Sequence, residues 1–88
     1  MKLKFNFAIQ EVLGMYLAVS VGDENNKFDG VLRLNETGKR ILELIQDGLE
    51  PDAIVGTLKR EYDTTEDVLR DEVKKIVEQL QSEGLVEV

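Results

Sequence analysis

The sequence has no cysteine and no histidine among its 88 residues. Without cysteine there is no disulfide, no thiol nucleophile and no thiolate metal site. Without histidine the chain lacks the usual general base at neutral pH and the commonest zinc ligand. These absences count against catalysis, and we expect no enzymatic activity, no metal and no cofactor. The absence of cysteine also fits a cytoplasmic protein.

Long hydrophobic runs are absent as well, since none approaches the roughly 20 residues that span a bilayer. Lys2 and Lys4 stand before apolar residues, as in a signal peptide, but residues 3–10 alternate between apolar and polar side chains. This alternation is typical of a β-strand rather than of a signal peptide. We therefore expect no membrane partner and a cytoplasmic location.

The charge is acidic and unevenly distributed. The net charge at pH 7 is −7, and all of it lies in residues 35–88, because residues 1–34 carry equal numbers of basic and acidic side chains. Proteins that bind nucleic acids normally present clustered lysine and arginine to the phosphate backbone. In residues 65–83, six acidic side chains outnumber the basic Arg70, Lys74 and Lys75. The sequence therefore predicts no nucleic-acid partner.

Alternating apolar residues predict three strands, at residues 3–12, 15–21 and 28–34. Gly14 supplies the permissive backbone angles of the turn between the first two strands. Short connections favour an antiparallel meander with the second strand in the middle and the third at an edge.

Apolar residues at helical spacing predict three helices, at residues 36–46, 51–62 and 64–82. Polar caps, glycine and proline mark the helix ends, and a threonine followed three residues later by an aspartate resembles a capping box. The residues that carry these signals are Asn35, Gly48, Pro51, Thr64 and Asp67.

Together these elements predict one domain over residues 1–88. We expect an α+β fold in which a three-stranded antiparallel sheet is followed by a three-helix bundle, similar to a winged helix-turn-helix. Leu85 and Val86 follow the last helix, and we expect them to fold back onto the core.

The third predicted strand has two interpretations. An edge strand exposes unpaired backbone N–H and C=O groups, and proteins usually blunt such edges with charges or short length. Asp29 and Arg33 are modest devices of this kind and would keep the protein monomeric, so we expect a monomer or a weak dimer through the edge strand. Alternatively, the edge accepts a peptide as an extra strand, so that main-chain hydrogen bonds give affinity and side-chain pockets give selectivity.

The order of four short motifs favours the second interpretation. Leu34-Asn35, Asp47-Gly48, Glu61-Tyr62 and Gly84-Leu85 occur at spacings that resemble the PqqD-like family, the small peptide-binding proteins called RiPP recognition elements. The resemblance runs from about Phe7 to Glu87. It implies a protein that binds the leader peptide of a ribosomally synthesised precursor and presents it to a modifying enzyme, often a radical S-adenosylmethionine (SAM) enzyme. Such proteins act in the biosynthesis of peptide-derived natural products or cofactors.

The same resemblance implies where the leader peptide binds, namely against the third strand and the last helix. The backbone of the strand, an apolar helical stripe and two basic residues at its rim form the expected site. The expected peptide-binding residues are Phe28, Asp29, Gly30, Val31, Leu32, Arg33 and Leu34 on the strand and Leu69, Arg70, Val73, Lys74, Ile76, Val77 and Leu80 on the helix.

Two alternative functions remain open at this point. One is a winged-helix regulator of transcription, against which the acidic last helix counts. The other is a structural subunit that binds one enzyme without contacting its substrate.

Overall fold

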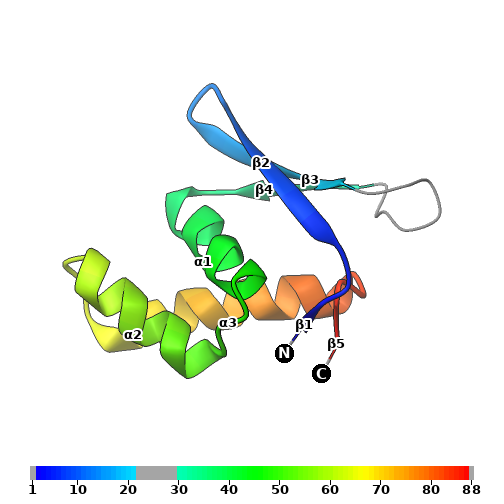
Figure 1. Ribbon diagram of the computed structural model, residues 1–88. Helices are drawn as coiled ribbons and strands as arrows, with labels where there is room; N and C mark the ends of the chain where they lie inside the picture. The colour runs from blue at the N-terminus through cyan, green and yellow to red at the C-terminus, as the bar shows by residue number, and fades with distance from the viewer. Residues whose placement is uncertain (1, 22–29, 88) are drawn as a thin grey trace.

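The computed structural model describes residues 2–21 and 30–87, and its strands precede its helices along the chain, apart from one short closing strand (Figure 1). The predicted α+β class is confirmed. The elements are β1 (Lys2–Leu3), β2 (Asn6–Val12), β3 (Met15–Val21), β4 (Val31–Leu34), α1 (Glu36–Gln46), α2 (Pro51–Glu61), α3 (Glu66–Ser82) and β5 (Val86–Glu87).

The main sheet has the order β2-β3-β4, and both pairings are antiparallel, as the meander predicts. A two-residue turn, Leu13-Gly14, joins Val12 to Met15, which are direct partners. Both turn residues have positive φ, 52° at Leu13 and 81° at Gly14. Such turns match the right-handed twist of paired strands, and they favour glycine or asparagine at both positions.

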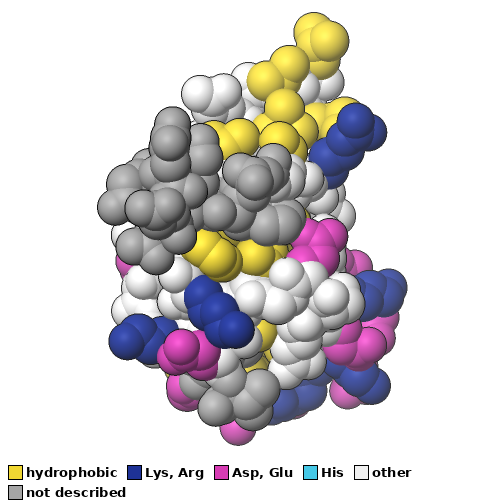
Figure 2. Space-filling model, turned by 90° about the vertical axis from the view of Figure 1, so that its right-hand side faces the viewer, with side chains coloured by type: hydrophobic (Ala, Val, Ile, Leu, Met, Phe, Trp, Pro, Cys, Tyr) yellow, Lys and Arg dark blue, Asp and Glu magenta, His cyan; other side chains and the backbone are white. Residues whose placement is uncertain are grey.

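The three helices lie on one side of this sheet (Figure 1). Because side chains alternate along a strand, the sheet has an inner face toward the helices and an outer face away from them. Phe7, Ala18, Leu32 and Leu34 are buried on the inner face. The outer face carries partly exposed apolar side chains, and Figure 2 shows hydrophobic side chains gathered at the top of the molecule, where the β2–β3 hairpin ends.

The prediction of one continuous strand over residues 3–12 is wrong. The chain bends at Lys4 and Phe5, so that β1 pairs with β5 and only β2 joins the main sheet. The Lys4 backbone N–H donates to the Leu85 carbonyl at 2.9 Å. The alternation of apolar residues continues through both pieces, and for this reason the sequence does not reveal the bend. Leu85 and Val86 are buried, as expected.

Local capping signals place the ends of the helices. The Asn35 side-chain oxygen accepts a hydrogen bond from the Gly38 N–H at 2.7 Å, which confirms the predicted cap of α1. The predicted capping box on the last helix is wrong, because Thr65, rather than Thr64, is the N-cap of α3 and accepts from the Val68 N–H at 3.3 Å. Because two threonines follow one another, the sequence alone does not determine which of them is the N-cap of α3.

A single cluster of buried apolar side chains joins the sheet to the helices. α1 lies at its centre, between the sheet and α3, and its Ile41 and Leu42 have no solvent exposure. Burial of this apolar surface is the main source of stability, at roughly 25 cal/mol per Å². The cluster consists of Phe7, Ala18, Leu32, Leu34, Ile41, Leu42, Leu44, Ile45, Ile54, Val55, Leu58, Leu69, Val73, Leu80, Leu85 and Val86.

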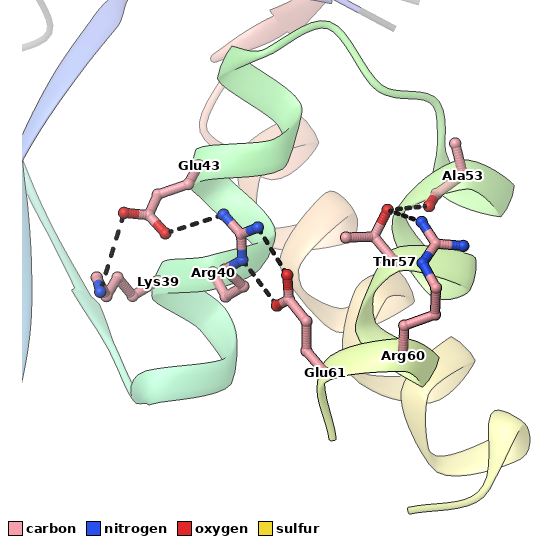
Figure 3. Close-up of polar contacts among 7 residues, drawn as sticks. All are labelled: Lys39, Arg40, Glu43, Ala53, Thr57, Arg60 and Glu61. Atoms are coloured by element: carbon pink, nitrogen blue, oxygen red, sulfur yellow. Dashed lines mark hydrogen bonds and ion pairs between the residues drawn. The ribbon is translucent and has the colours of Figure 1, made fainter. Parts of the chain in front are cut away.

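A polar network on the surface connects α1 to α2 (Figure 3). Arg40 on α1 donates from Nε and Nη2 to the two carboxylate oxygens of Glu61 on α2, each at 2.8 Å. Glu43, one turn further along α1, lies 3.5 Å from Arg40 Nη1 and 3.9 Å from Lys39 Nζ. These contacts hold the last turn of α2 against the first half of α1.

Candidate functional site

The sheet has a free edge at β4, because β3 is its only partner strand among the described residues. The turn at the β2–β3 hairpin determines which backbone groups reach this edge. In a hairpin with a two-residue turn, the residues that flank the turn exchange hydrogen bonds, and bonded and non-bonded pairs then alternate along the strands. Met15 and Leu17 therefore bond toward β2, and Tyr16 and Ala18 bond on their other side, toward β4.

The partners of Tyr16 and Ala18 on β4 are Leu34 and Leu32. These two leucines direct their backbone N–H and C=O groups toward β3. It follows that the N–H and C=O groups of Val31 and Arg33 point away from the sheet, to the free edge. The edge thus presents two backbone N–H donors and two backbone C=O acceptors, spaced as in a β-strand that lacks its neighbour.

Ile76 of α3 lies near the end of β4. A β-carbon placed on Gly38 would lie 3.2 Å from Ile76 Cδ1 and 3.4 Å from Leu34 Cβ. The missing side chain at Gly38 therefore lets α3 pack closely where β4 ends and α1 begins. Ile76 is partly exposed, so it contributes apolar surface beside the end of β4.

A hollow of about 290 Å³ lies next to this junction, between the start of α1 and the start of α3. The side chain of Val68 is half exposed there, and burial raises the pKa of the Tyr62 phenol, which stays protonated at neutral pH. The residues around the hollow are Asn35, Thr37, Tyr62, Asp63, Thr64, Val68, Leu69 and Glu72. Val68 and Glu72 were not among the expected peptide-binding residues, although Glu72 lies four residues before Ile76 and Val68 four residues before Glu72, a spacing that makes each pair neighbours on a helix.

Three residues of the expected helical stripe belong to the core instead. Leu69, Val73 and Leu80 are buried and packed in the central apolar cluster, so each leaves little side-chain surface for a peptide. We therefore leave these three residues out of the binding surface proposed below. Helical periodicity marks an apolar side of a helix, but it does not show which element covers that side.

Arg70, Lys74 and Val77 line a separate groove of about 360 Å³, which α3 forms with Pro51 and Val55 of α2. On the helix, Arg70 and Lys74 lie about 120° and 160° from Ile76. The structure therefore does not bring the two basic side chains together with β4.

The basic side chains of α3 are also largely matched by acidic ones. Arg70 donates to Asp52 at 2.8 Å and lies 3.6 Å from Glu66, and the bond to Asp52 raises the pKa of Arg70. Lys75 lies 3.2 Å from Asp71. Because these charges are locally compensated, α3 does not present the basic surface that a DNA-recognition helix needs.

Two other features bear on possible functions. Across residues 2–21 and 30–87, no group of three or more acidic side chains is placed to hold a metal ion. In the same part of the chain, no helix is long and apolar enough to cross a bilayer. Of the expected strand residues, Phe28 and Asp29 lie outside the described residues, and Gly30 directly precedes β4.

The sequence and the fold both have known counterparts. A model of the family described as coenzyme PQQ synthesis protein D (PqqD) matches residues 21–86, and the chain therefore belongs to this family. Comparison with curated proteins finds no match.

Two solved structures share the fold. One is described as TbiB1 in complex with the TbiA(beta) leader peptide; it has 18% sequence identity and a TM-score of 0.72, over 99% of this chain and 95% of that one. The other is described as lasso peptide synthetase B1 complexed with the leader peptide, with 16% identity and a TM-score of 0.69, over 99% of this chain and 96% of that one.

Proposed function

We propose that this protein binds the leader segment of a ribosomally synthesised precursor peptide and presents it to a modifying enzyme. The leader segment adds to the sheet as a further strand, beside β4. The observation that carries this proposal is the free edge of β4, where the backbone groups of Val31 and Arg33 point outward near the partly exposed side chain of Ile76. An extended peptide can satisfy all four backbone groups, and its side chains then reach the apolar surface beside α3.

Two further findings support the proposal. The chain belongs to the PqqD family, and both similar solved structures are described as complexes with a leader peptide. The binding surface that we propose comprises Gly30 to Leu34 with Val68, Glu72 and Ile76. Arg70, Lys74 and Val77 face the groove with α2 and are not part of it.

We assign no catalytic step to this chain. Without histidine and cysteine, general acid–base catalysis at neutral pH would fall to carboxylates, lysine or tyrosine, whose pKa must be shifted by burial or by neighbouring charges for this purpose. No charged side chain is buried among the described residues. The chemistry on the precursor therefore belongs to the partner enzyme, for which we propose a radical SAM enzyme. We propose a cytoplasmic location for the protein, because ribosomes release the precursor in the cytoplasm.

Amide NMR shifts recorded during a peptide titration test the proposed function. The probe is a synthetic peptide that covers the leader segment of a short precursor encoded beside the gene for this protein. We expect the shifts to concentrate at residues 30–34 and 68–76. Shifts confined to β2 or α2, or no binding at millimolar peptide, would show that the edge of β4 is not the site.

A further inference from the structure

The outer face of the sheet carries a single charged side chain among the described residues, that of Arg33. The other residues of this face on the three strands are uncharged, and most of them are apolar. They are Asn6, Ala8, Gln10, Val12, Met15, Leu17, Val19, Val21 and Val31.

The residues that line hollows together with Arg33 are uncharged and mostly apolar. Its direct partner on β3 is Leu17, and it shares a hollow of about 250 Å³ with Val12, Leu13 and Met15 at the hairpin end. No acidic side chain in the described part of the chain forms an ion pair with it. Arg33 thus differs from Arg70, whose charge Asp52 and Glu66 compensate.

The backbone of Arg33 points to the free edge, so a residue of an added strand will stand directly opposite it. In an antiparallel pair the side chains of opposite residues lie on the same face, with Cβ atoms about 4.5–5.5 Å apart. The incoming side chain therefore meets the Arg33 guanidinium on the outer face. Two residues further along the peptide, the next side chain on this face meets Val31.

We propose that Arg33 makes the site selective for an acidic residue, followed two positions later in the peptide by an apolar residue that packs on Val31. This inference rests on the proposed function and names the class of segment that the site accepts. Opposite charges on directly opposite residues stabilise the pairing of two strands, and like charges destabilise that pairing. A local cation is needed at this edge, because the −7 net charge of the protein otherwise repels an acidic peptide.

Selection from a displayed library of random peptides tests this inference without knowledge of the natural precursor. On the wild-type protein we expect enrichment of Asp or Glu at one position, with an apolar residue two positions later. On R33E the same position should change to Lys or Arg, and on R33Q the charge preference should disappear. The matched control is K74E, which changes the net charge as R33E does but lies on the α2 side of α3, and it should retain the acidic preference.

Binding of one selected peptide then gives the size of the effect. Replacing its acidic residue by the neutral amide should weaken binding to the wild type by about two- to fivefold, as expected for one cross-strand pair. On R33Q the same replacement should have no effect. Circular dichroism of each variant confirms that it is folded.

The outcomes separate this inference from the proposed function. If selected peptides lose binding to the Val31→Pro variant but show no acidic preference, Arg33 is not a selectivity residue and the proposed function stands. If K74E abolishes the acidic preference and R33E does not, the peptide lies in the groove between α2 and α3. If no peptide is enriched, both the inference and the proposed function are wrong.

Discussion

Arg40 and Glu61 face each other across α1 and α2 through two parallel hydrogen bonds of 2.8 Å (Figure 3). This bidentate geometry is the strongest arrangement of an arginine and a carboxylate. The bond from Arg40 holds the pKa of the Glu61 carboxyl below its usual range, and it raises the pKa of Arg40.

This ion pair predicts a pH-dependent contribution to stability. A carboxyl whose pKa is lower in the folded state stabilises the protein above its unfolded pKa, which is about 4.3. That contribution is lost as the pH falls through the lower folded value. The melting temperature of E61Q should therefore lie below that of the wild type at pH 7, and the gap should close below about pH 4.

The measurement is a series of thermal melts from pH 7 to pH 2, with R40Q as the control. R40Q removes the other partner of the same ion pair, so the difference in melting temperature between R40Q and the wild type should close over the same pH range. A gap that stays constant with pH would mean that the pair does not contribute through its charge.

The backbone orientation of β4 predicts opposite effects of proline at two adjacent positions. Proline removes the N–H donor, which edge positions tolerate and paired positions do not. Leu32→Pro should unfold the protein, because the Leu32 N–H bonds to β3. Val31→Pro should keep the fold and weaken peptide binding by about tenfold or more, since one ladder hydrogen bond is lost and the ring obstructs the peptide. Thermal melts and peptide titration of both variants check this, and unchanged affinity in folded Val31→Pro would exclude strand addition at this edge.

The two sides of α3 predict different effects on binding. Ile76→Ala should weaken peptide binding by about tenfold, because Ile76 contributes apolar surface beside β4. Val77→Ala is the matched control, since it removes a partly exposed apolar side chain that faces α2. Isothermal titration calorimetry measures both affinities. If Val77→Ala weakened binding more than Ile76→Ala, the peptide would lie in the groove between α2 and α3.

The hairpin turn predicts a stabilising substitution. Leu13 is 99% exposed and has a φ of 52°, so its side chain gains no burial while its backbone is strained. Asparagine adopts this conformation more readily, and Leu13→Asn should raise the free energy of unfolding by about 1 kcal/mol. Urea denaturation measures this difference, and Leu13→Val serves as a control that should destabilise, because β-branched residues resist positive φ. A loss of stability in Leu13→Asn would mean that Leu13 packs on another surface in solution.

The composition predicts that the purified protein holds no structural or catalytic metal. The chain offers neither thiolate nor imidazole ligands, so zinc and iron lack their preferred donors. Elemental analysis should therefore find both metals well below one equivalent after dialysis. A stoichiometric metal that survives dialysis would contradict this expectation.

The sequence by itself determined the elements whose signals are local. Asn35 caps α1 because an asparagine oxygen reaches the N–H groups just after it, whatever lies elsewhere in the chain. The Leu13-Gly14 turn and the apolar periodicities are equally local, and they gave the order of the strands and helices. The expected edge strand followed from these, because short connections leave few topologies.

The tertiary structure alone decided the features that depend on contacts between distant residues. The bend at Lys4 and Phe5 exists because β1 pairs with β5 from the other end of the chain. Leu69 and Ile76 lie about 20° apart around α3, yet Leu69 is buried in the core and Ile76 is partly exposed, whereas Arg70 lines the groove toward α2. Helical periodicity gives only the angular positions of these three residues on the helix, whereas packing against other elements determines which of them a peptide can reach.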